Sequence, residues 1–381
     1  MAFPEGMATT ARALQYAKAF RDSGHEVTVV CHGWSEIDAS STRNTEVRGA
    51  VGGIAFWYPS GSTYRSSSFL RRRLRALLSW VRILSAVVRN RPAGVLIYPM
   101  TPTTALLLLP LSRMTHTRVL CDQSELPEVH TGVGILGHVR LAFKAWGMRH
   151  SDGILAITPA IAERLRSMSR SSRILHVPVL IDAEDYGQHP EECGPTDIVY
   201  SGFLDDEKDG VSTLIEAFAQ LTTSHPGPRL VLVGDANPKH VRSYRTLSAN
   251  LGVGDSVVFR GMLARSDLLG LLGRAAVLVL PRPDTAQNQA NMPTKLVEYL
   301  ASGRPVVATS VGLVPEMVED VIEAILVPPG DSAALAAGLC RVLDDPAGAA
   351  DMAARGRQRA LASHDYRAYS ARLEYFAFGD H

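Results

Sequence analysis

The apolar positions of this chain follow helical spacing in some segments and form short continuous runs in others. Between residues 11 and 21, apolar side chains such as Leu14 and Ala17 recur on one helix face, and Gly24 then precedes the apolar run 27–31. This succession predicts a helix, a stop and a buried strand. The pattern continues with strands near 54–58, 95–98, 118–122, 153–157 and 174–177, separated by helices near 69–88, 103–114 and 139–150 and from 159 onward.

A second series of the same kind begins at Asp197. It predicts strands at 197–201, 229–233, 257–259, 277–280, 305–309 and 324–327, with helices in the intervals. Strands separated by helices indicate parallel pairing, because a parallel crossover needs about a dozen residues. The segment between the two series carries proline, glycine and acidic residues without periodicity, which is typical of a linker.

We therefore predict an α/β protein with two Rossmann-like domains in tandem. The first domain spans residues 1–178, a linker spans 179–196, and the second domain spans 197–360. The C-terminal residues 361–381 are expected to form a helix that returns to the first domain. The first domain begins with a glycine-containing turn and a helix, whereas a Rossmann-like domain normally begins with a strand. Either the natural start lies upstream of Met1, or this domain lacks its first strand.

The composition of the chain argues against several classes of protein. The chain has 39 basic and 38 acidic residues, so no strong overall field favours a nucleic-acid partner. The most apolar stretch, 95–111, is broken by prolines and is shorter than the roughly 20 residues that a spanning helix needs. No secretory signal is visible at the N-terminus. The cysteines are widely separated, which argues against structural zinc and a disulfide scaffold and favours a reducing cytoplasm: Cys31, Cys121, Cys193 and Cys340.

The predicted helix at 69–89 is amphipathic and basic. Leu70, Leu74, Leu77 and Val81 belong to one apolar stripe, and arginines occupy much of the remaining surface. Such a helix is able to lie on an anionic membrane, which would suit an acceptor carried on a lipid and a location at the inner face of the cell membrane. The alternative is a helix that packs its apolar stripe on the sheet and leaves a solvated basic face.

Candidate binding residues follow from the strand-to-helix turns, because ligands of parallel sheets bind beyond the carboxyl ends of the strands. After the strand 197–201, Gly202 begins a turn in which Lys208 is able to reach a diphosphate as a mobile charge. A merely solvated lysine is the alternative. Gly234 and Asp235 follow the next strand, where glycine permits either a close backbone approach or an ordinary tight turn. Arg265, after the third strand, is a candidate for holding a nucleotide base.

The strongest candidate is the helix that begins near Pro293. Proline suits the first helical turn, and we expect the amides of Thr294, Lys295 and Leu296 to be free to bind phosphate. The side chain of Lys295 adds positive charge there. One turn further on, the carboxylate of Glu298 is suited to accept two ribose hydroxyls.

The order of these motifs resembles the family 4 retaining glycosyltransferases. The resemblance rests on Gly202 to Lys208, on Gly234–Asp235, on Arg260–Gly261 and above all on the segment Met292-Pro-Thr-Lys-Leu-Val-Glu-Tyr-Leu-Ala-Ser-Gly-Arg-Pro-Val-Val-Ala308. Phe3-Pro-Glu-Gly6 and Gly24-His-Glu-Val-Thr-Val29 support it in the first half. The resemblance implies a GT-B fold, in which two Rossmann-like domains face each other across a cleft.

The resemblance also implies a reaction. A sugar would pass from a nucleotide-sugar donor, with retention, to a glycan, lipid-linked or small-molecule acceptor. Glu298 would hold the ribose, Lys208 and the amides near Thr294 and Lys295 would bind the diphosphate, and Gly6 would approach it from the first domain. The departing phosphate would itself deprotonate the acceptor, so no protein nucleophile, metal or other cofactor is expected. Lys208 and Lys295 are then the candidate catalytic groups, because stabilising the leaving group is electrostatic work.

Two departures from the family pattern leave other functions open. Phe203 stands where the family often has arginine, and Ala290 stands where it often has an acidic residue. Lys295 and Arg282 are candidates to compensate. The alternatives are a catalytically silent, sugar-nucleotide-binding subunit and a sugar-nucleotide epimerase of the same fold.

On the first domain, the polar residues at the end of the strand 118–122 and directly after it are expected to face the cleft: Asp122, Ser124, Glu125, Glu128 and His130. Among them, Glu125 and His130 are the candidates for orienting an acceptor or the transferred sugar. For His130, a plain surface histidine is an equal alternative.

Overall fold

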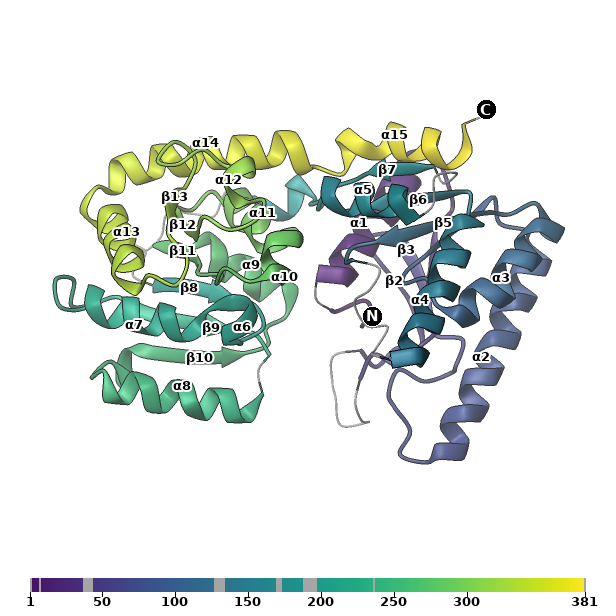
Figure 1. The fold of residues 1–381 in the computed structure, drawn as a ribbon, viewed down its shortest axis with the longest axis horizontal. Coiled ribbons are helices and arrows are strands. Elements are labelled where there is room, and N and C mark those ends of the chain that lie inside the picture. Colours follow the sequence, from purple (N-terminus) through teal and green to yellow (C-terminus); the bar gives the residue numbers. More distant parts are fainter. Residues whose placement is uncertain are drawn as a thin grey trace. The chain divides into compact units, whose positions relative to one another are not determined.

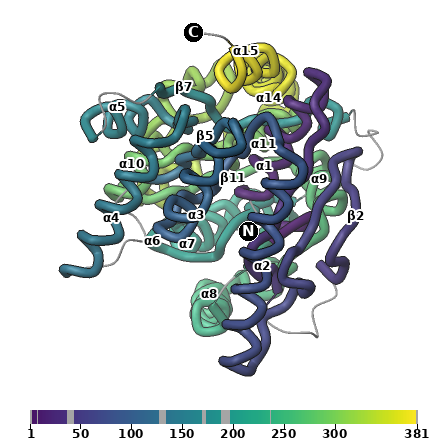
Figure 2. Tube along the Cα trace, turned by 90° about the vertical axis from the view of Figure 1, so that its right-hand side faces the viewer, coloured from purple at the N-terminus to yellow at the C-terminus, as the bar shows by residue number. Residues whose placement is uncertain are grey.

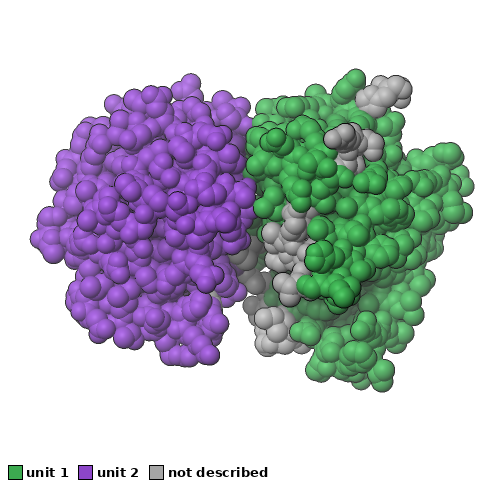
Figure 3. Space-filling model, viewed as in Figure 1, with its two compact units in different colours: residues 1–180, 366–381 green, residues 181–365 purple. Residues whose placement is uncertain are grey.

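The structure is a computed structural model, and it divides the chain into two compact units (Figure 3). Unit 1 comprises residues 1–180 and 366–381, and unit 2 comprises residues 181–365. The structure describes the following residues: 2–6, 8–36, 44–126, 134–168, 173–187, 197–235 and 237–379.

Unit 1 is an α/β unit whose elements appear on the right of Figure 1. The elements are α1 (Ala8–Asp22), β1 (Thr28–Val30), β2 (Arg48–Val51), β3 (Ile54–Trp57), α2 (Phe69–Asn90), β4 (Gly94–Ile97), α3 (Pro102–Thr115), β5 (Arg118–Gln123), α4 (Gly134–Arg149), β6 (Gly153–Ala156), α5 (Pro159–Met168), β7 (Ile174–His176) and α15 (Arg367–Phe378). One sheet has the strand order β1-β3-β2 and the other β4-β5-β6-β7. The predicted helices and strands of the first half are confirmed to within a few residues.

Strand β2 was not predicted, and it pairs antiparallel with β3. The expectation of purely parallel pairing is therefore wrong at this hairpin. Its two-residue turn is Gly52–Gly53, with φ of 54° and 76°, values that glycine adopts without strain. The Gly-Gly pair was the available sequence signal, but the flanking strands are only four residues long and carry weak periodicity.

The C-terminal helix α15 is an integral part of unit 1. Its residues Leu373 and Phe376 are buried in the same cluster as Leu120 and Leu155 of the sheet β4-β5-β6-β7. Tyr366, which directly precedes α15, donates a hydrogen bond of 2.6 Å to Asp22 at the end of α1. A segment more than 340 residues from the N-terminal helix thus completes the core of unit 1.

Helix α2 does not bury the apolar stripe that was predicted for it. Leu70 and Leu77 are 77% and 62% exposed, whereas Ser79 and Val87 are the helix residues that are buried. The interpretation of the stripe as a sheet-packing face is therefore wrong. In the residues that the structure describes, no helix combines the length and the apolar character needed to span a bilayer.

Unit 2 contains a single sheet in which all neighbouring strands are parallel (Figure 1, left). Its elements are η1 (Ala183–Tyr186), β8 (Asp197–Ser201), α6 (Asp206–Asp209), α7 (Val211–Leu221), β9 (Arg229–Val233), α8 (Pro238–Asn250), η2 (Gly254–Ser256), β10 (Val257–Gly261), α9 (Arg265–Gly273), β11 (Val277–Leu280), α10 (Ala286–Ala290), α11 (Thr294–Ala301), β12 (Val306–Thr309), α12 (Val314–Met317), β13 (Ile325–Val327), α13 (Ser332–Asp344) and α14 (Pro346–His364). The strands that the sequence predicted for the second half are all confirmed.

The strand order of unit 2 locates its binding edge. The order β10-β9-β8-β11-β12-β13 is the 3-2-1-4-5-6 order of dinucleotide-binding domains. Consecutive strands are laid down outward from β8 on one side and from β11 on the other, so the order reverses between β8 and β11. Ligands of such sheets bind beyond the carboxyl ends of the strands at this switch point.

Candidate functional site

The turn after β8 passes directly against the turn after β9. Gly202 donates a backbone hydrogen bond of 2.8 Å to Val233, and Gly234 donates one of 2.8 Å to Gly261. Gly234 has a φ of 138°, and a Cβ there would lie 1.6 Å from the carbonyl oxygen of Gly202. The close approach predicted at Gly234 is thus made by the neighbouring backbone. Asp235 is exposed, and its carbonyl oxygen accepts a hydrogen bond of 2.9 Å from Leu204.

Lys295 lies beneath this turn. Its Nζ atom donates to Asp209 Oδ1 at 2.5 Å and to the hydroxyl of Tyr200 at 2.9 Å. A Cβ on Gly202 would come within 2.2 Å of the same ammonium group. Burial lowers the pKa of Lys295, and the neighbouring carboxylate of Asp209 opposes that shift. The predicted diphosphate-binding cation is therefore present at the site, and in this structure it is paired with Asp209.

Arg282 adds a second buried cation beyond the end of β11. Its Nε and Nη2 atoms donate to Asn288 Oδ1 at 3.1 and 2.6 Å. Its Nη1 atom is buried and has no hydrogen-bond partner among the described residues, and the same holds for Asp209 Oδ2. Burial lowers the pKa of Arg282, whereas Asp209 and Tyr200 raise it. With Lys295, the cluster holds two cations and one carboxylate, so it has an excess of positive charge and an unused donor.

Lys208 belongs to the same turn and is exposed. Its amide donates to Asp205 Oδ1 at 3.0 Å, and its carbonyl oxygen accepts from Asn288 Nδ2 at 2.9 Å. Asn288 therefore holds helix α6 and Arg282 together. The charge of Lys208 contributes to lowering the pKa of Lys295. The two predicted lysines are thus close enough in space to repel each other.

The start of α11 differs in part from the prediction. The amide of Thr294 donates to Met292 at 2.9 Å and that of Leu296 donates to Pro293 at 3.0 Å. The reason is local: Pro293 has φ −77° and ψ 75°, the geometry of an inverse γ-turn, which closes the first of these bonds. The expectation of three free amides is therefore wrong for Thr294 and Leu296. In the described part of the chain, the amide of Lys295 has no such backbone acceptor.

Glu298 and Arg265, predicted for the ribose and the base, are paired with each other. Arg265 Nη1 donates to Glu298 Oε1 at 2.5 Å, and its Nη2 atom donates to the hydroxyl of Tyr186 at 2.9 Å. Burial works against the charged form of Arg265, but Glu298 and Tyr186 outweigh it and raise its pKa. Within the described residues, the second carboxylate oxygen of Glu298 makes no hydrogen bond. It is the atom that remains for a ligand hydroxyl.

The candidates of unit 1 are placed only in part. Glu125 is half-buried after β5, and its backbone oxygen accepts a hydrogen bond from the side chain of Gln123. Gly6 lies against Thr10 and Ala2, where a Cβ would be 2.1 Å from Thr10 Oγ1. Glu128 and His130 lie outside the described residues.

Asp122 was expected to face outward, toward the cleft, and this expectation is wrong. Its side chain is 2% exposed and accepts hydrogen bonds from Arg12, Tyr16 and Ser124 at 2.8–3.2 Å. Arg12 also donates to the carbonyl oxygens of Val177 and Pro178. The pair therefore ties α1 to β5 and to the end of the β7 segment, which is a structural role.

Sequence reasoning missed the side chains that hold the site together. Tyr200, Asp209 and Asn288 are buried polar residues that pair with predicted residues or with Arg282. Asp209 lay inside an acidic run and Tyr200 inside a buried strand, so neither gave a distinct signal. Asn288 lies five positions before Pro293, ahead of the helix that the sequence singled out as the strongest candidate.

Comparison with known proteins gives two matches to family models. Residues 6–179 match the glycosyl transferase 4-like domain, and residues 195–345 match the glycosyl transferases group 1. A curated relative is the glycogen synthase of Mycobacterium tuberculosis (strain ATCC 25618 / H37Rv), 28% identical over 244 residues. That alignment spans 61% of this chain and 56% of the relative, so it covers little more than half the relative's length.

Solved structures resemble nearly the whole chain. Sucrose-phosphate synthase from Thermosynechococcus elongatus superposes with a TM-score of 0.72 at 19% identity, over 96% of this chain and 91% of that one. The HepE protein of Anabaena, solved with UDP and glucose, gives a TM-score of 0.70 at 17% identity, over 97% and 95%. These likenesses confirm the predicted GT-B fold class.

Proposed function

We propose, from the premise that this chain belongs to the family 4 glycosyltransferases of GT-B fold, that it transfers a sugar from a nucleotide sugar to an acceptor. The observation that carries the proposal is the buried cluster of Arg282, Lys295 and Asp209 at the switch point of unit 2. Two cations against one carboxylate, with a guanidinium donor unused, suit a ligand of high negative charge. A diphosphate is such a ligand.

In this proposal the diphosphate binds at the turn after β8. The exposed Lys208 closes on it as a mobile charge, and Nη1 of Arg282 and the amide of Lys295 supply directed donors. The ammonium of Lys295 sets the local potential while it stays paired with Asp209. Preorganised cations of this kind stabilise the charge that develops on the leaving group.

The ribose is assigned to Glu298. One of its oxygens is held by Arg265, so the proposal is that the other accepts a ribose hydroxyl while Arg265 and Tyr186 fix the carboxylate. A carboxylate held on one side loses little freedom when it binds on the other. Arg265 then lies where the base of the nucleotide is expected.

The finer features of the reaction are part of the same proposal. Transfer occurs with retention, the departing phosphate takes the acceptor's proton, and no metal or other cofactor is needed. The acceptor is a glycan, a lipid-linked glycan or a small molecule, oriented by Glu125 and His130 with Gly6 nearby. For a lipid-linked acceptor the protein works in the cytoplasm at the membrane, with residues 69–89 as the contact segment.

A catalytically silent binding subunit is the second candidate. Phe203 is 37% exposed at the turn where the family often has an arginine, and it supplies no charge there. Lys295 is paired with Asp209 and so is less available to a leaving group. Both observations favour a protein that binds a sugar nucleotide without cleaving it.

The test is a thermal-shift panel of UDP-, GDP- and ADP-sugars, followed by nucleotide-release assays with and without acceptors. A bound donor at a hundred times its dissociation constant stabilises the native state by about 2.7 kcal/mol. Binding followed by acceptor-dependent release supports the transferase. Binding without release supports the silent subunit, a changed sugar without release supports an epimerase, and the absence of any shift contradicts the site. Persistence of activity in EDTA tests metal independence.

The ribose assignment has its own prediction. Glu298→Ala should abolish the thermal shift, because a neutral methyl group accepts no hydroxyl and leaves Arg265 without its carboxylate. Glu216→Ala, at an exposed position of α7, is the matched control and should keep the full shift. An undiminished shift in Glu298→Ala would mean that the ribose is held elsewhere.

A further inference from the structure

Helix α2 presents a continuous apolar stripe to solvent. Leu70, Leu74, Leu77, Val81 and Val88 are each more than half exposed. Their spacing of three, four or seven residues places them on one side of the helix. Monomeric soluble proteins rarely expose so long an apolar row, and such a row marks an interaction surface.

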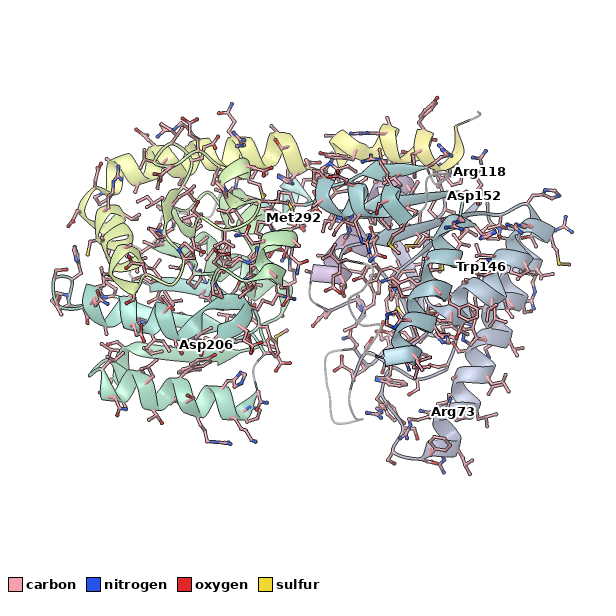
Figure 4. All side chains as sticks on the ribbon, viewed as in Figure 1. Arg73, Arg118, Trp146, Asp152, Asp206 and Met292 are labelled. Carbon is pink, nitrogen blue, oxygen red and sulfur yellow. The ribbon has the colours of Figure 1, made fainter. Side chains whose placement is uncertain are left out.

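The stripe is bordered by arginines. An arginine directly follows the stripe residue at four places, namely Arg71, Arg75, Arg82 and Arg89. One residue along a helix is a rotation of about 100°, so these side chains lie beside the stripe. Arg73, near the N-terminal end of the helix, adds to this charge (Figure 4). In the described ranges, no carboxylate lies within ion-pair distance of any arginine of α2.

The excess of positive charge extends beyond helix α2. From Val47 to Cys121 the chain has eleven arginines and no acidic residue, which leaves 28 basic against 38 acidic residues for the remainder. This stretch includes α2 and α3, which pack together in unit 1 (Figure 2). The near-neutral chain thus carries one strongly basic region, and that region contains the exposed apolar stripe.

We propose that this side of unit 1 docks on an anionic lipid surface, with α2 lying in the plane of the membrane interface. The apolar stripe enters the boundary between headgroups and acyl chains, and the exposed flanking guanidinium groups, those of Arg71, Arg82 and Arg89, bind lipid phosphates. Helix α2 is about 33 Å long and already formed: Ser68 caps its start and Arg91, in the left-handed region, ends it. Membrane binding therefore carries no free-energy cost for folding this helix.

A second copy of this chain fits the stripe less well. A two-fold contact through α2 would bring the same arginine rows together, with no acidic residue on α2, α3 or α4 to compensate them. Anionic lipid headgroups supply the missing negative charge along the whole helix. Charge complementarity therefore selects the lipid surface as the occupant.

For a lipid-linked acceptor, this inference rests on the proposed function and adds how the protein reaches the membrane. Its test measures membrane binding and needs no glycosyl transfer. The full chain is sedimented with vesicles of phosphatidylcholine alone or with phosphatidylglycerol. We expect binding to the anionic vesicles that weakens with salt and is absent with phosphatidylcholine alone. Leu74→Asp with Leu77→Asp should abolish binding, and Arg71→Gln with Arg89→Gln should weaken it by about tenfold or more.

Matched controls lie in unit 2. Leu251→Asp replaces another exposed leucine, and Arg242→Gln with Arg274→Gln removes two exposed arginines. These controls should bind anionic vesicles as the unaltered chain does, and the melting temperatures of all variants should be unchanged, because the altered side chains are exposed. The donor thermal shift should persist in the α2 variants, which separates this proposal from that of the donor site.

Three outcomes overturn the proposal. The first is a failure of the unaltered chain to bind phosphatidylglycerol vesicles, and the second is equal binding by the Leu74→Asp, Leu77→Asp variant. The third is a dimer in solution that the same variant converts to a monomer, which would assign the stripe to a second copy. Light scattering after size exclusion distinguishes this result.

Discussion

Arg282 is a buried side chain with an unsatisfied donor, and this combination is unfavourable unless a ligand accepts a hydrogen bond from that donor. A buried charge without enough partners destabilises a protein by several kcal/mol, so such groups are usually paired. Asn288 accepts hydrogen bonds from two nitrogen atoms of Arg282. The third, Nη1, and the nearby Asp209 Oδ2 have no hydrogen-bond partner within the described part of unit 2. A bound diphosphate would complement Nη1. Arg282 thereby supplies a cation that Phe203 does not.

Replacing Arg282 should separate phosphate recognition from base recognition. A hydrogen bond to a charged group contributes about 1.5–3 kcal/mol, so Arg282→Met should weaken nucleoside diphosphate binding by about 10- to 150-fold. The corresponding nucleoside, which has no phosphate, should bind almost unchanged. Isothermal titration measures both. Arg274→Met, at an exposed arginine of the same unit, is the control, and an equal loss for nucleoside and diphosphate would contradict the role.

The lowered pKa of Lys295 predicts a pH dependence of donor binding. Burial favours the neutral amine, so Lys295 loses its proton at a lower pH than an ordinary lysine. The charged form attracts the diphosphate; affinity is therefore full below this pKa and falls as the pH rises through it. Lys295→Arg should remove the alkaline fall, because guanidinium stays protonated. Titrations from neutral to alkaline pH compare the two, and identical profiles would rule out Lys295 as the titrating group.

At the scale of the elements, the sequence predicted what depends on local pattern. The boundaries of β8, β9 and β11 agree with the structure because each strand is a continuous apolar run that a glycine or a proline follows directly. The hairpin strand β2 was missed because four residues carry little periodicity. The pairing of Lys295 with Asp209 was also missed, because these residues are 86 positions apart and only the folded sheet brings them together.

The contact between the turns after β8 and β9 gives a prediction at this scale. Gly234→Ala should destabilise unit 2 by more than the about 1–3 kcal/mol that its positive φ alone costs, because the new methyl group would overlap the Gly202 carbonyl. Gly227 has a nearly identical φ of 145° and open space around it, so Gly227→Ala measures the backbone strain alone. Urea unfolding gives both values. Equal losses would mean that the turns can move apart at little cost.

At the scale of the whole molecule, the chain crosses between its units twice. Unit 1 is begun by the first 180 residues and finished by the last helix, with unit 2 inserted between them. The tandem alternation of helices and strands was enough to predict two α/β units. A C-terminal helix that returns to the first domain was predicted from the tail of the chain. The residues that pack against α15 were not predicted, because they belong to α1, β5 and β6 and lie far from it in the sequence.

The role of α15 in unit 1 can be measured with one matched pair of variants. Leu373 is fully buried in the core that α15 shares with β5 and β6, whereas Tyr375 on the same helix is 65% exposed. Leu373→Ala should lower the free energy of unfolding by about 2–5 kcal/mol, the usual cost of a cavity at a buried leucine. Tyr375→Ala should change it by less than about 0.5 kcal/mol. The cavity arises in unit 1, far along the chain from Glu298, so a folded Leu373→Ala protein should keep its donor thermal shift. If both variants were equally stable in denaturant titrations, α15 would not be part of the core of unit 1.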